Sequence, residues 1–141
     1  MKLKVGTEFN RIVDVMNGVF GWNYKACMKG YYIVSKSKNS SAWFPKMADL
    51  SNGKPQPGDK WYGWCNTFSD DQKYIYMNNF ENPERLYMIP PATSEPHITF
   101  AKRQGEKLYR YVGVYRRIKL DKDLGWVYER IAEDINTDDY L

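Results

Sequence analysis

The residues most able to do chemistry in this sequence are aromatic, and three of them lie close together. Trp61, Tyr62 and Trp64 fall within four consecutive positions. Tryptophan and tyrosine rings have flat faces on which the bases of nucleic acids stack. Such rings also fill the cores of β-proteins, so both interpretations stay open at this point. The candidates for binding a flat ligand are Trp43, Trp61, Tyr62, Trp64, Tyr74 and Tyr76.

Basic side chains form the second group, and they occur in and around two predicted loops. Lysine and arginine in such loops contact phosphate groups and thereby position a duplex. Arg103 lies at the turn of a predicted hairpin, from which an arginine can enter a groove of the duplex. An ordinary polar hairpin tip is the alternative. The basic candidates are Lys54, Lys60, Lys102, Arg103, Lys107 and Arg110.

Groups for acid–base or metal chemistry are sparse. His97 is the only histidine, and its closeness in sequence to Ser94 and Glu95 is weak support for a catalytic triad. Cys27 and Cys65 are the only cysteines, so the chain cannot assemble a disulfide framework or a four-ligand zinc site. We therefore expect no metal, no cofactor and no catalytic residue.

One acidic pattern leaves an enzymatic alternative open. Asp71 and Lys73, with Asp59 twelve residues before Asp71, imitate the spacing with which metal-dependent nucleases hold Mg²⁺ and a water molecule. Residues 69–72 are equally typical of a plain turn, and two-acid patterns of this kind arise often by chance. A metal-dependent nuclease is therefore kept only as an alternative.

Composition favours one globular domain over residues 1–141, since 43% of the 141 residues are hydrophobic and 27% are charged. Residues 1–120 hold 19 Lys and Arg against 10 Asp and Glu, whereas residues 121–141 hold 2 against 7. A basic body suits a polyanion. We expect residues 1–132 to be the folded body and residues 133–141 to be a loose acidic tail. Without a long apolar run or a signal sequence, we expect a cytoplasmic protein with no membrane partner.

The elements that must position the candidate residues are one helix and several strands. Apolar residues recur at helical spacing from Phe9 to Phe20, and Thr7 is placed to cap that helix. Strands are expected at residues 30–35, 60–65, 74–77 and 126–131, and the hairpin of residues 97–102 and 107–119, with strict alternation along 107–119, is the clearest. Residues 51–59 and 78–96 are expected to be irregular. These elements favour an α+β fold, a strongly curved, mostly antiparallel sheet or barrel on which the N-terminal helix packs.

The order of these motifs resembles the SRA-like and PUA-like β-barrel modules of modification-dependent restriction systems. The resemblance rests on Val5-Gly6 before the helix, the Trp-rich strand, His97-Ile-Thr-Phe-Ala-Lys with Leu108-Tyr-Arg-Tyr-Val-Gly-Val-Tyr, and Val127-Tyr-Glu-Arg-Ile. Residues 97–118 match best. The resemblance implies a barrel that reads DNA on a concave face and, in several members, flips a modified base into an aromatic pocket.

We therefore expect a reader of nucleic acid, DNA rather than RNA, that recognises modified bases in a restriction or phage-defence setting. Any nuclease activity is expected on another domain or on a partner protein. If the Trp-rich strand is only packing, the pocket is to be sought around Trp43 or Tyr109. The alternative is a protein-interaction module, including a phage-encoded inhibitor of a defence enzyme. Its acidic tail would engage a basic partner or the basic body through Glu133, Asp134, Asp138 and Asp139.

Overall fold

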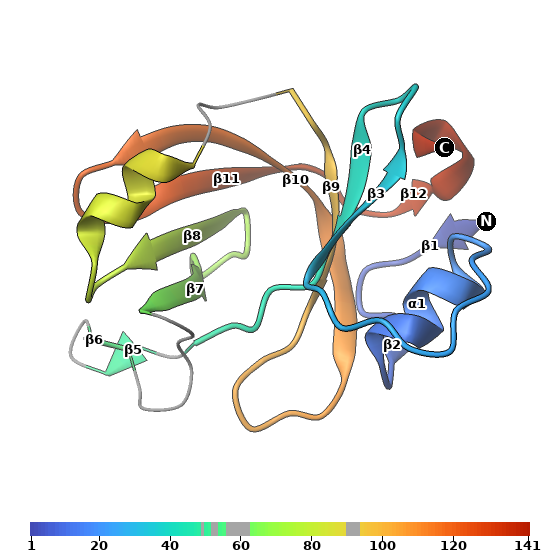
Figure 1. The fold of residues 1–141 in the computed structure, drawn as a ribbon, viewed down its shortest axis with the longest axis horizontal. Coiled ribbons are helices and arrows are strands. Elements are labelled where there is room, and N and C mark those ends of the chain that lie inside the picture. Colours follow the sequence, from blue (N-terminus) through green and yellow to red (C-terminus); the bar gives the residue numbers. More distant parts are fainter. Residues whose placement is uncertain (49, 52–53, 56–62, 90–93) are drawn as a thin grey trace.

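The structure, a computed structural model, describes residues 1–48, 50–51, 54–55, 63–89 and 94–141. Most of this part of the chain is one sheet, whose strands are β2 (Glu8–Phe9), β3 (Tyr31–Ser35), β4 (Ser40–Trp43), β7 (Trp64–Phe68), β8 (Tyr74–Asn79), β9 (His97–Ala101), β10 (Tyr109–Asp121) and β11 (Gly125–Ala132). The strand order is β3-β4-β9-β10-β11-β8-β7, and β2 pairs with β10 (Figure 1). Neighbouring strands are antiparallel except β4 and β9, which are parallel.

Short elements lie around this sheet. They are α1 (Ile12–Gly18), two 3₁₀ helices, η1 (Pro83–Met88) and η2 (Thr137–Tyr140), and two small strand pairs, β1 (Lys2–Leu3) with β12 (Ile135–Asn136) and β5 (Leu50–Ser51) with β6 (Lys54–Pro55). In Figure 1, α1, β1 and β12 lie in one half of the molecule, and η1, β7 and β8 lie in the other. Among the described residues, no helix is long and apolar enough to cross a membrane.

Strand β10 links the two halves, and a bulge redirects its side chains. Its first part pairs with β9 and its second part with β11. The register shifts between Tyr111 and Gly113, and Gly113 has a φ of 133°. Because a bulge inserts an extra residue, Tyr111 and Val114 pack into one core, whereas Val112 and Tyr115 pack into another. The strict alternation predicted for residues 107–119 is therefore wrong at this point.

Each face of the sheet has its own hydrophobic core. In β9, Ile98 and Phe100 point to the first core, which α1 covers, whereas Ala101 points to the second. Phe100 is fully buried in the first core, with its ring 5.3 Å from the Phe44 ring and 5.6 Å from the Phe9 ring. The second core, on the opposite face, is formed by Met47, Ile75, Leu86, Ala101, Val112, Tyr115, Trp126 and Tyr128.

Two expectations about the fold differ from the structure. Strands β3 and β7 end the sheet in the described part of the chain, so the sheet is not closed into a barrel. The helix begins only at Ile12, because Phe9 belongs to β2, which pairs with β10. The Thr7 hydroxyl donates to the Lys4 carbonyl instead of capping the helix. Helical spacing of apolar residues does not reveal where such a tertiary pairing replaces the first turn.

The acidic C-terminal segment is part of the fold, which corrects the expectation of a loose tail over residues 133–141. β12 pairs with β1, and the Val5 N–H donates to Asp134 Oδ1 at 2.9 Å. The Tyr111 hydroxyl donates to the Glu133 carbonyl. Ile135 packs against the first core. The acidic composition of residues 133–141 suggests a solvated segment, but the apolar residues and the backbone pairing of this segment hold it in place.

Candidate nucleic-acid interface

A compact group of aromatic side chains lies on the second face of the sheet. The strands that carry them, β3, β4, β9 and β11, come together near the middle of the molecule (Figure 1). The Trp43 ring centroid lies 4.6 Å from that of Tyr128 and 6.0 Å from that of His97. The Tyr31 ring lies 6.0 Å from the His97 ring. We call Tyr31, Trp43, His97 and Tyr128 the aromatic cluster. Tyr31 is 41% exposed, so part of the cluster is open to a ligand.

A hydrogen bond and a nearby carboxylate hold one side of the His97 ring. Its Nδ1 lies 2.6 Å from Ser41 Oγ and 3.6 Å from Glu95 Oε2. Burial, followed by the positive charge of Arg117, lowers the pKa of His97 to about 4, so the ring is neutral at pH 7. On the other side of the ring, Nε2 is buried and has no hydrogen-bond partner among the described residues. Such an atom marks a place that a ligand or a water molecule completes.

Tyr31 and Glu95 extend this polar network towards the edge of the sheet. The Tyr31 hydroxyl donates to Glu95 Oε1 at 2.8 Å. Burial, and then this hydrogen bond, raise the pKa of Tyr31 to about 12, so the phenol keeps its proton at neutral pH. The cluster therefore presents an uncharged tyrosine and an uncharged histidine beside one carboxylate.

Arg117 places a positive charge against the cluster. Its guanidinium carbon lies 5.2 Å from the centroid of the Trp126 ring and 5.9 Å from that of the Tyr128 ring. Its Nη1 lies 3.4 Å from the Tyr128 hydroxyl. Stacking on two aromatic faces holds the guanidinium in one place. A fixed cation at this position suits an electron-rich or anionic ligand.

On β7 the same face of the sheet carries Trp64 and Asn66. Asn66 pairs with Met77, and Met77 pairs with Trp126, so the three side chains share a face. Asn66 Nδ2 donates to the Lys46 carbonyl at 3.5 Å, whereas its Oδ1 is buried without a partner among the described residues. Trp64 is half-buried and packs against the second core. This face thus holds a second buried acceptor without a donor.

The structure brings two of the predicted aromatic residues to this face and places two others, Tyr74 and Tyr76, on the opposite face. Trp43 and Trp64 both pack against the second core. Tyr74 precedes Ile75, a member of that core, and therefore points to the opposite face, where its ring lies parallel to the Tyr76 ring at 6.4 Å. Trp61 and Tyr62 lie outside the described residues, so their predicted role stays a prediction.

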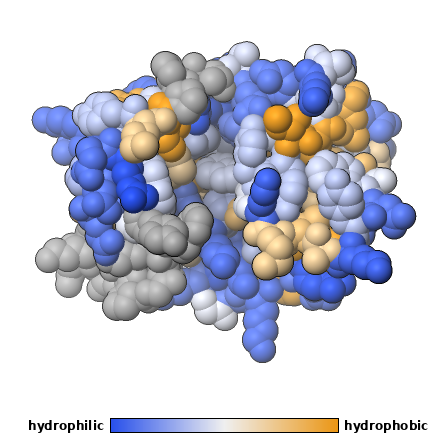
Figure 2. Space-filling view, viewed as in Figure 1, coloured by the Kyte–Doolittle hydropathy of each residue, from blue (hydrophilic) through white to orange (hydrophobic). Residues whose placement is uncertain are grey.

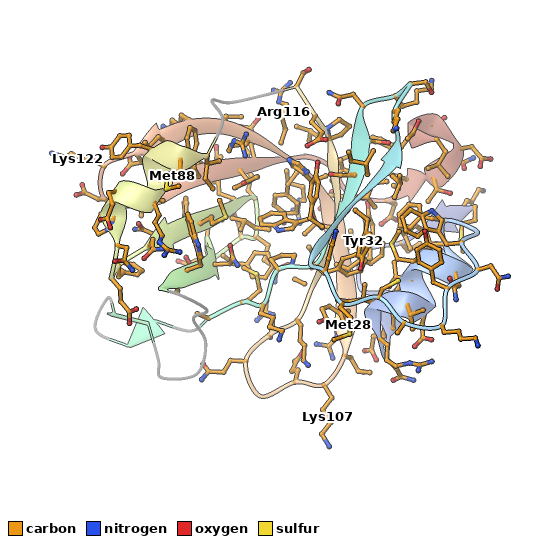
Figure 3. The ribbon with its side chains drawn as sticks, in the orientation of Figure 1. Met28, Tyr32, Met88, Lys107, Arg116 and Lys122 are labelled. Atoms are coloured by element: carbon orange, nitrogen blue, oxygen red, sulfur yellow. The ribbon has the colours of Figure 1, made fainter. Side chains whose placement is uncertain are left out.

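Three basic candidates lie at the end of the β9–β10 hairpin. Lys107 is exposed, and Figure 3 shows it pointing away from the body of the molecule. Arg103 is exposed as well, with its guanidinium 5.4 Å from the Phe68 ring. Lys102 is half-buried, and its Nζ lies 5.6 Å from the Tyr109 ring. This group can contact phosphates without any rearrangement of the core.

The remaining candidates differ from these in their surroundings. Arg110 lies 3.2 Å from Glu8 and also pairs with Glu106, so two carboxylates compensate its charge. With Arg103 it lines a cavity of about 280 Å³ beside the hairpin. Tyr109 is buried in the first core, where its ring meets the Phe44 ring edge-on at 5.8 Å, so it has no free face for stacking. Lys54 is described only as backbone of β6, and Lys60 lies outside the described residues.

The acidic pattern considered for a nuclease falls partly in a turn. Asp71 accepts hydrogen bonds from the Ser69 hydroxyl at 2.8 Å and from the Lys73 N–H at 3.0 Å. These bonds lower the pKa of Asp71, the backbone bond from Lys73 most strongly. Asp59 lies outside the described residues, so the paired-acid pattern stays a prediction.

The polar residues of the site, His97 and Asn66, are not predicted as binding residues from the sequence. The signal for His97 is a lone histidine that begins an otherwise apolar strand directly after Glu95 and Pro96. No local pattern indicates Asn66, because it is enclosed through a bridge to Met47, a residue nineteen positions earlier. Contacts between distant segments leave no trace in a single sequence.

Comparison with known proteins identifies the family to which this fold belongs. A family model for the SRA domain (SET and RING associated domain) matches residues 2–137. Among solved structures, the chain matches the 5-hydroxymethylcytosine-specific restriction enzyme AbaSI with a TM-score of 0.70 and 22% identity, over 96% of this chain and 42% of that one. The chain therefore spans less than half the length of AbaSI, and comparison with the curated proteins finds no match. Because the family model covers nearly all of its length, the chain belongs to the SRA (SET and RING associated) family of DNA-binding domains.

Proposed function

We propose that this domain reads modified bases in DNA and holds an extruded base against the aromatic cluster and Trp64. One observation carries the proposal: aromatic faces lie on the same sheet face as two buried polar atoms without partners, His97 Nε2 and Asn66 Oδ1. A base presents a flat face to stack on and a polar edge to hydrogen-bond. The face offers complementary groups for both.

The energies involved are compatible with extrusion of a base. Taking a base out of the duplex costs a few kcal/mol. Stacking on an aromatic side chain returns about 1–3 kcal/mol per base. Hydrogen bonds to buried atoms that otherwise lack partners return more, because the protein no longer carries unsatisfied groups. Two aromatic faces and one or two such bonds are enough to offset extrusion.

The shape and charge of the molecule support the same assignment. In Figure 2 the surface is recessed between the half that carries η1 and the half that carries α1. Arg103 and Lys107 project from the β9–β10 hairpin, so they are available to hold phosphates while a base occupies the recess. Contacts of this type give affinity, and the cluster gives selectivity.

The likeness to AbaSI supports a restriction setting for this reader, with phage defence as its wider context. By its name AbaSI acts on DNA with 5-hydroxymethylcytosine, and it is more than twice as long as the part that matches. We propose that the nuclease acting with this reader lies on another domain or on a partner protein. The reader itself then supplies recognition and no catalysis.

The proposal is tested with one duplex that carries a single central cytosine in unmodified, methylated or hydroxymethylated form, at fixed salt. We expect at least tenfold tighter binding to a modified form. A 2-aminopurine placed beside the target cytosine should gain fluorescence as its neighbour leaves the stack. Equal affinity for the three duplexes would contradict the reader, and preference without a fluorescence change would contradict extrusion.

The rival proposal, a protein-interaction module or enzyme inhibitor, depends on the acidic segment 133–141. Part of that charge is used within the chain, because Glu133 pairs with Arg130 at 3.0 Å and Asp134 accepts from the Val5 N–H. The described contacts therefore favour the DNA reader. A pull-down partner that binds equally well after Trp43→Ala would favour the rival.

A further inference from the structure

We infer that His97 Nε2 is a hydrogen-bond acceptor that selects bases carrying a donor hydrogen, amino or hydroxyl, on the edge that enters the aromatic cluster. This inference rests on the proposed function and adds the residue that determines its specificity. It depends on which ring nitrogen of His97 carries the proton, and the surrounding groups decide that.

The position of His97 suits direct contact with a ligand rather than with solvent. Its side chain is only 7% exposed, and Tyr31, Trp43 and Tyr128 surround the ring at centroid distances of 5.8 to 6.0 Å. Ser41 and Glu95 occupy the Nδ1 side, whereas Nε2 has no partner among the described residues. The nitrogen without a partner is thus the one directed away from the polar network.

The carboxylate of Glu95 favours a proton on Nδ1. Its Oε2 lies 3.6 Å from Nδ1. A lone pair on Nδ1 would face this negative oxygen and be repelled, whereas an N–H would be attracted. In a neutral ring, a proton on Nδ1 leaves Nε2 with a lone pair.

The contact with Ser41 accommodates the same tautomer. The Tyr31 hydroxyl gives its proton to Glu95 Oε1, so the carboxylate stays an acceptor beside His97. A hydroxyl oxygen can accept as well as donate, so Ser41 Oγ accepts from a proton on Nδ1 at the 2.6 Å contact.

An acceptor at Nε2 sets the chemistry of the ligand. A carbonyl oxygen facing it would place two lone pairs together, which is unfavourable in a buried site. An amino group, as on cytosine, or a hydroxyl group, as on a hydroxymethyl substituent, would supply the missing donor.

The test uses one duplex with four pyrimidines at a single position. These bases differ in their exocyclic donors: 5-hydroxymethylcytosine has both, 5-methylcytosine has the amino group alone, 5-hydroxymethyluracil has the hydroxyl alone, and thymine has neither and keeps only its ring N3–H. We expect the wild type to bind thymine about tenfold more weakly than the best donor base. The two intermediate bases identify which donor Nε2 accepts. His97→Leu should remove this difference, and His97→Gln, which keeps an acceptor, should retain part of it.

Glu95→Gln provides a sharper variant. An amide in place of the carboxylate removes the negative oxygen beside Nδ1, so the ring proton is no longer held on that nitrogen. The variant should therefore lose preference for donor bases relative to thymine. Glu84→Gln, the same substitution at an exposed residue of η1, is the matched control and should leave the preference unchanged.

The tautomer is also measurable without DNA, which keeps the inference testable if a variant fails to fold. His97 is the only histidine, so long-range ¹H–¹⁵N spectra of the wild type contain one imidazole. We expect its proton on Nδ1. A proton on Nε2, or a donor preference unchanged in His97→Leu, would overturn the inference while leaving the reader intact. Equal binding of all modified duplexes and thymine by the wild type would overturn the proposed function as well.

Discussion

The rings of Trp43 and Tyr128 are in contact, with centroids 4.6 Å apart and planes tilted by 31°, although β9 and β10 separate their strands in the sheet. In a flat sheet, strands three positions apart are separated by about 14 Å. The contact therefore shows that the sheet curls towards its second face between β4 and β11. This curl brings β4 and β11 together around the aromatic cluster.

Trp43→Ala is expected to separate recognition from stability. Trp43 is half-buried at the end of β4, so its loss should cost about 1–3 kcal/mol of DNA binding with the fold retained. Phe100→Ala, at a fully buried residue, should instead cost about 3–5 kcal/mol of folding. Thermal unfolding and affinity for the hydroxymethylated duplex are measured on both variants. If Trp43→Ala lowers thermal stability as much as Phe100→Ala does, Trp43 is a core residue only. Trp64→Ala is expected to behave like Trp43→Ala, with weaker DNA binding and the fold retained.

The hairpin end should control the salt dependence of binding. The logarithm of affinity falls with the logarithm of salt concentration at a slope of about −0.9 per neutralised phosphate. Replacing Arg103 and Lys107 with Ala should lower the magnitude of that slope by up to about 2, because both are exposed on the hairpin. Lys122→Ala is the control: Lys122 is an exposed lysine in the β10–β11 turn, far from the hairpin end in Figure 3. Equal slopes for all variants would remove the hairpin from the interface.

The C-terminal segment, residues 133–141, should contribute more to folding stability than its charges contribute to DNA binding. Deleting residues 135–141 removes Ile135 and Tyr140 from the first core and should cost about 2 kcal/mol or more of folding free energy. Asp138→Asn with Asp139→Asn keeps the segment and removes only exposed charges. We expect this double variant to bind DNA more tightly at low salt, by less than about threefold. At high salt its affinity should equal that of the wild type. Urea unfolding and binding at two salt concentrations distinguish these effects.

Gly113 is expected to tolerate no side chain, because the bulge of β10 depends on it. Its φ is 133°, and an added Cβ would lie 2.6 Å from Arg130 Cδ and 2.8 Å from the Ala132 carbonyl oxygen. Gly113→Ala should therefore cost about 1–3 kcal/mol of folding free energy through backbone strain, with the clash adding to this. Gly18→Ala, where nothing lies within 4 Å, is the control. Equal unfolding midpoints for the two variants would contradict a strained bulge.

The hairpin of β9 and β10 and the final strand β11 are predicted from the sequence because their signals are local. Alternating or continuous apolar residues mark each strand, and residues 122–124 form a compact turn between β10 and β11. The same local reasoning fails at Phe9, which has helical spacing but pairs with β10. A periodic pattern records which side chains are apolar, and it does not record which backbone partner is near.

The residues of the candidate site also divide into those that the sequence predicts and those that it does not. Trp43 and Trp64 are predictable because residue type alone suggests stacking. His97 and Asn66 are not, since their importance lies in buried atoms without partners, and those arise from how β4, β7 and β9 are brought together. Tyr109, predicted by type, is buried by packing against Phe44. Burial depends on the assembled sheet, so no spacing rule supplies it.

Protonation of His97 should make the folded state less stable in mild acid. In the unfolded chain a histidine has a pKa near 6.5, whereas burial, followed by the charge of Arg117, lowers the pKa of folded His97 to about 4. Between these values the unfolded state binds the proton and the folded state does not. Stability contributed by His97 is therefore complete above about pH 6.5 and is lost as pH falls towards about 4, by about 3 kcal/mol in all.

The measurement compares wild type with His97→Gln by urea unfolding at intervals from pH 7 to pH 4. The variant keeps Glu95, Arg117 and Tyr31 around the site, so the pH dependence of the other acids is shared and the difference between the proteins isolates His97. We expect the wild type to lose stability relative to the variant as pH falls. A constant difference would mean that His97 takes up its proton equally in both states, and a growing advantage for the wild type would mean that Glu95 holds a charged imidazole in the fold. Either result would contradict a buried neutral ring, and with it the acceptor that we assign to Nε2.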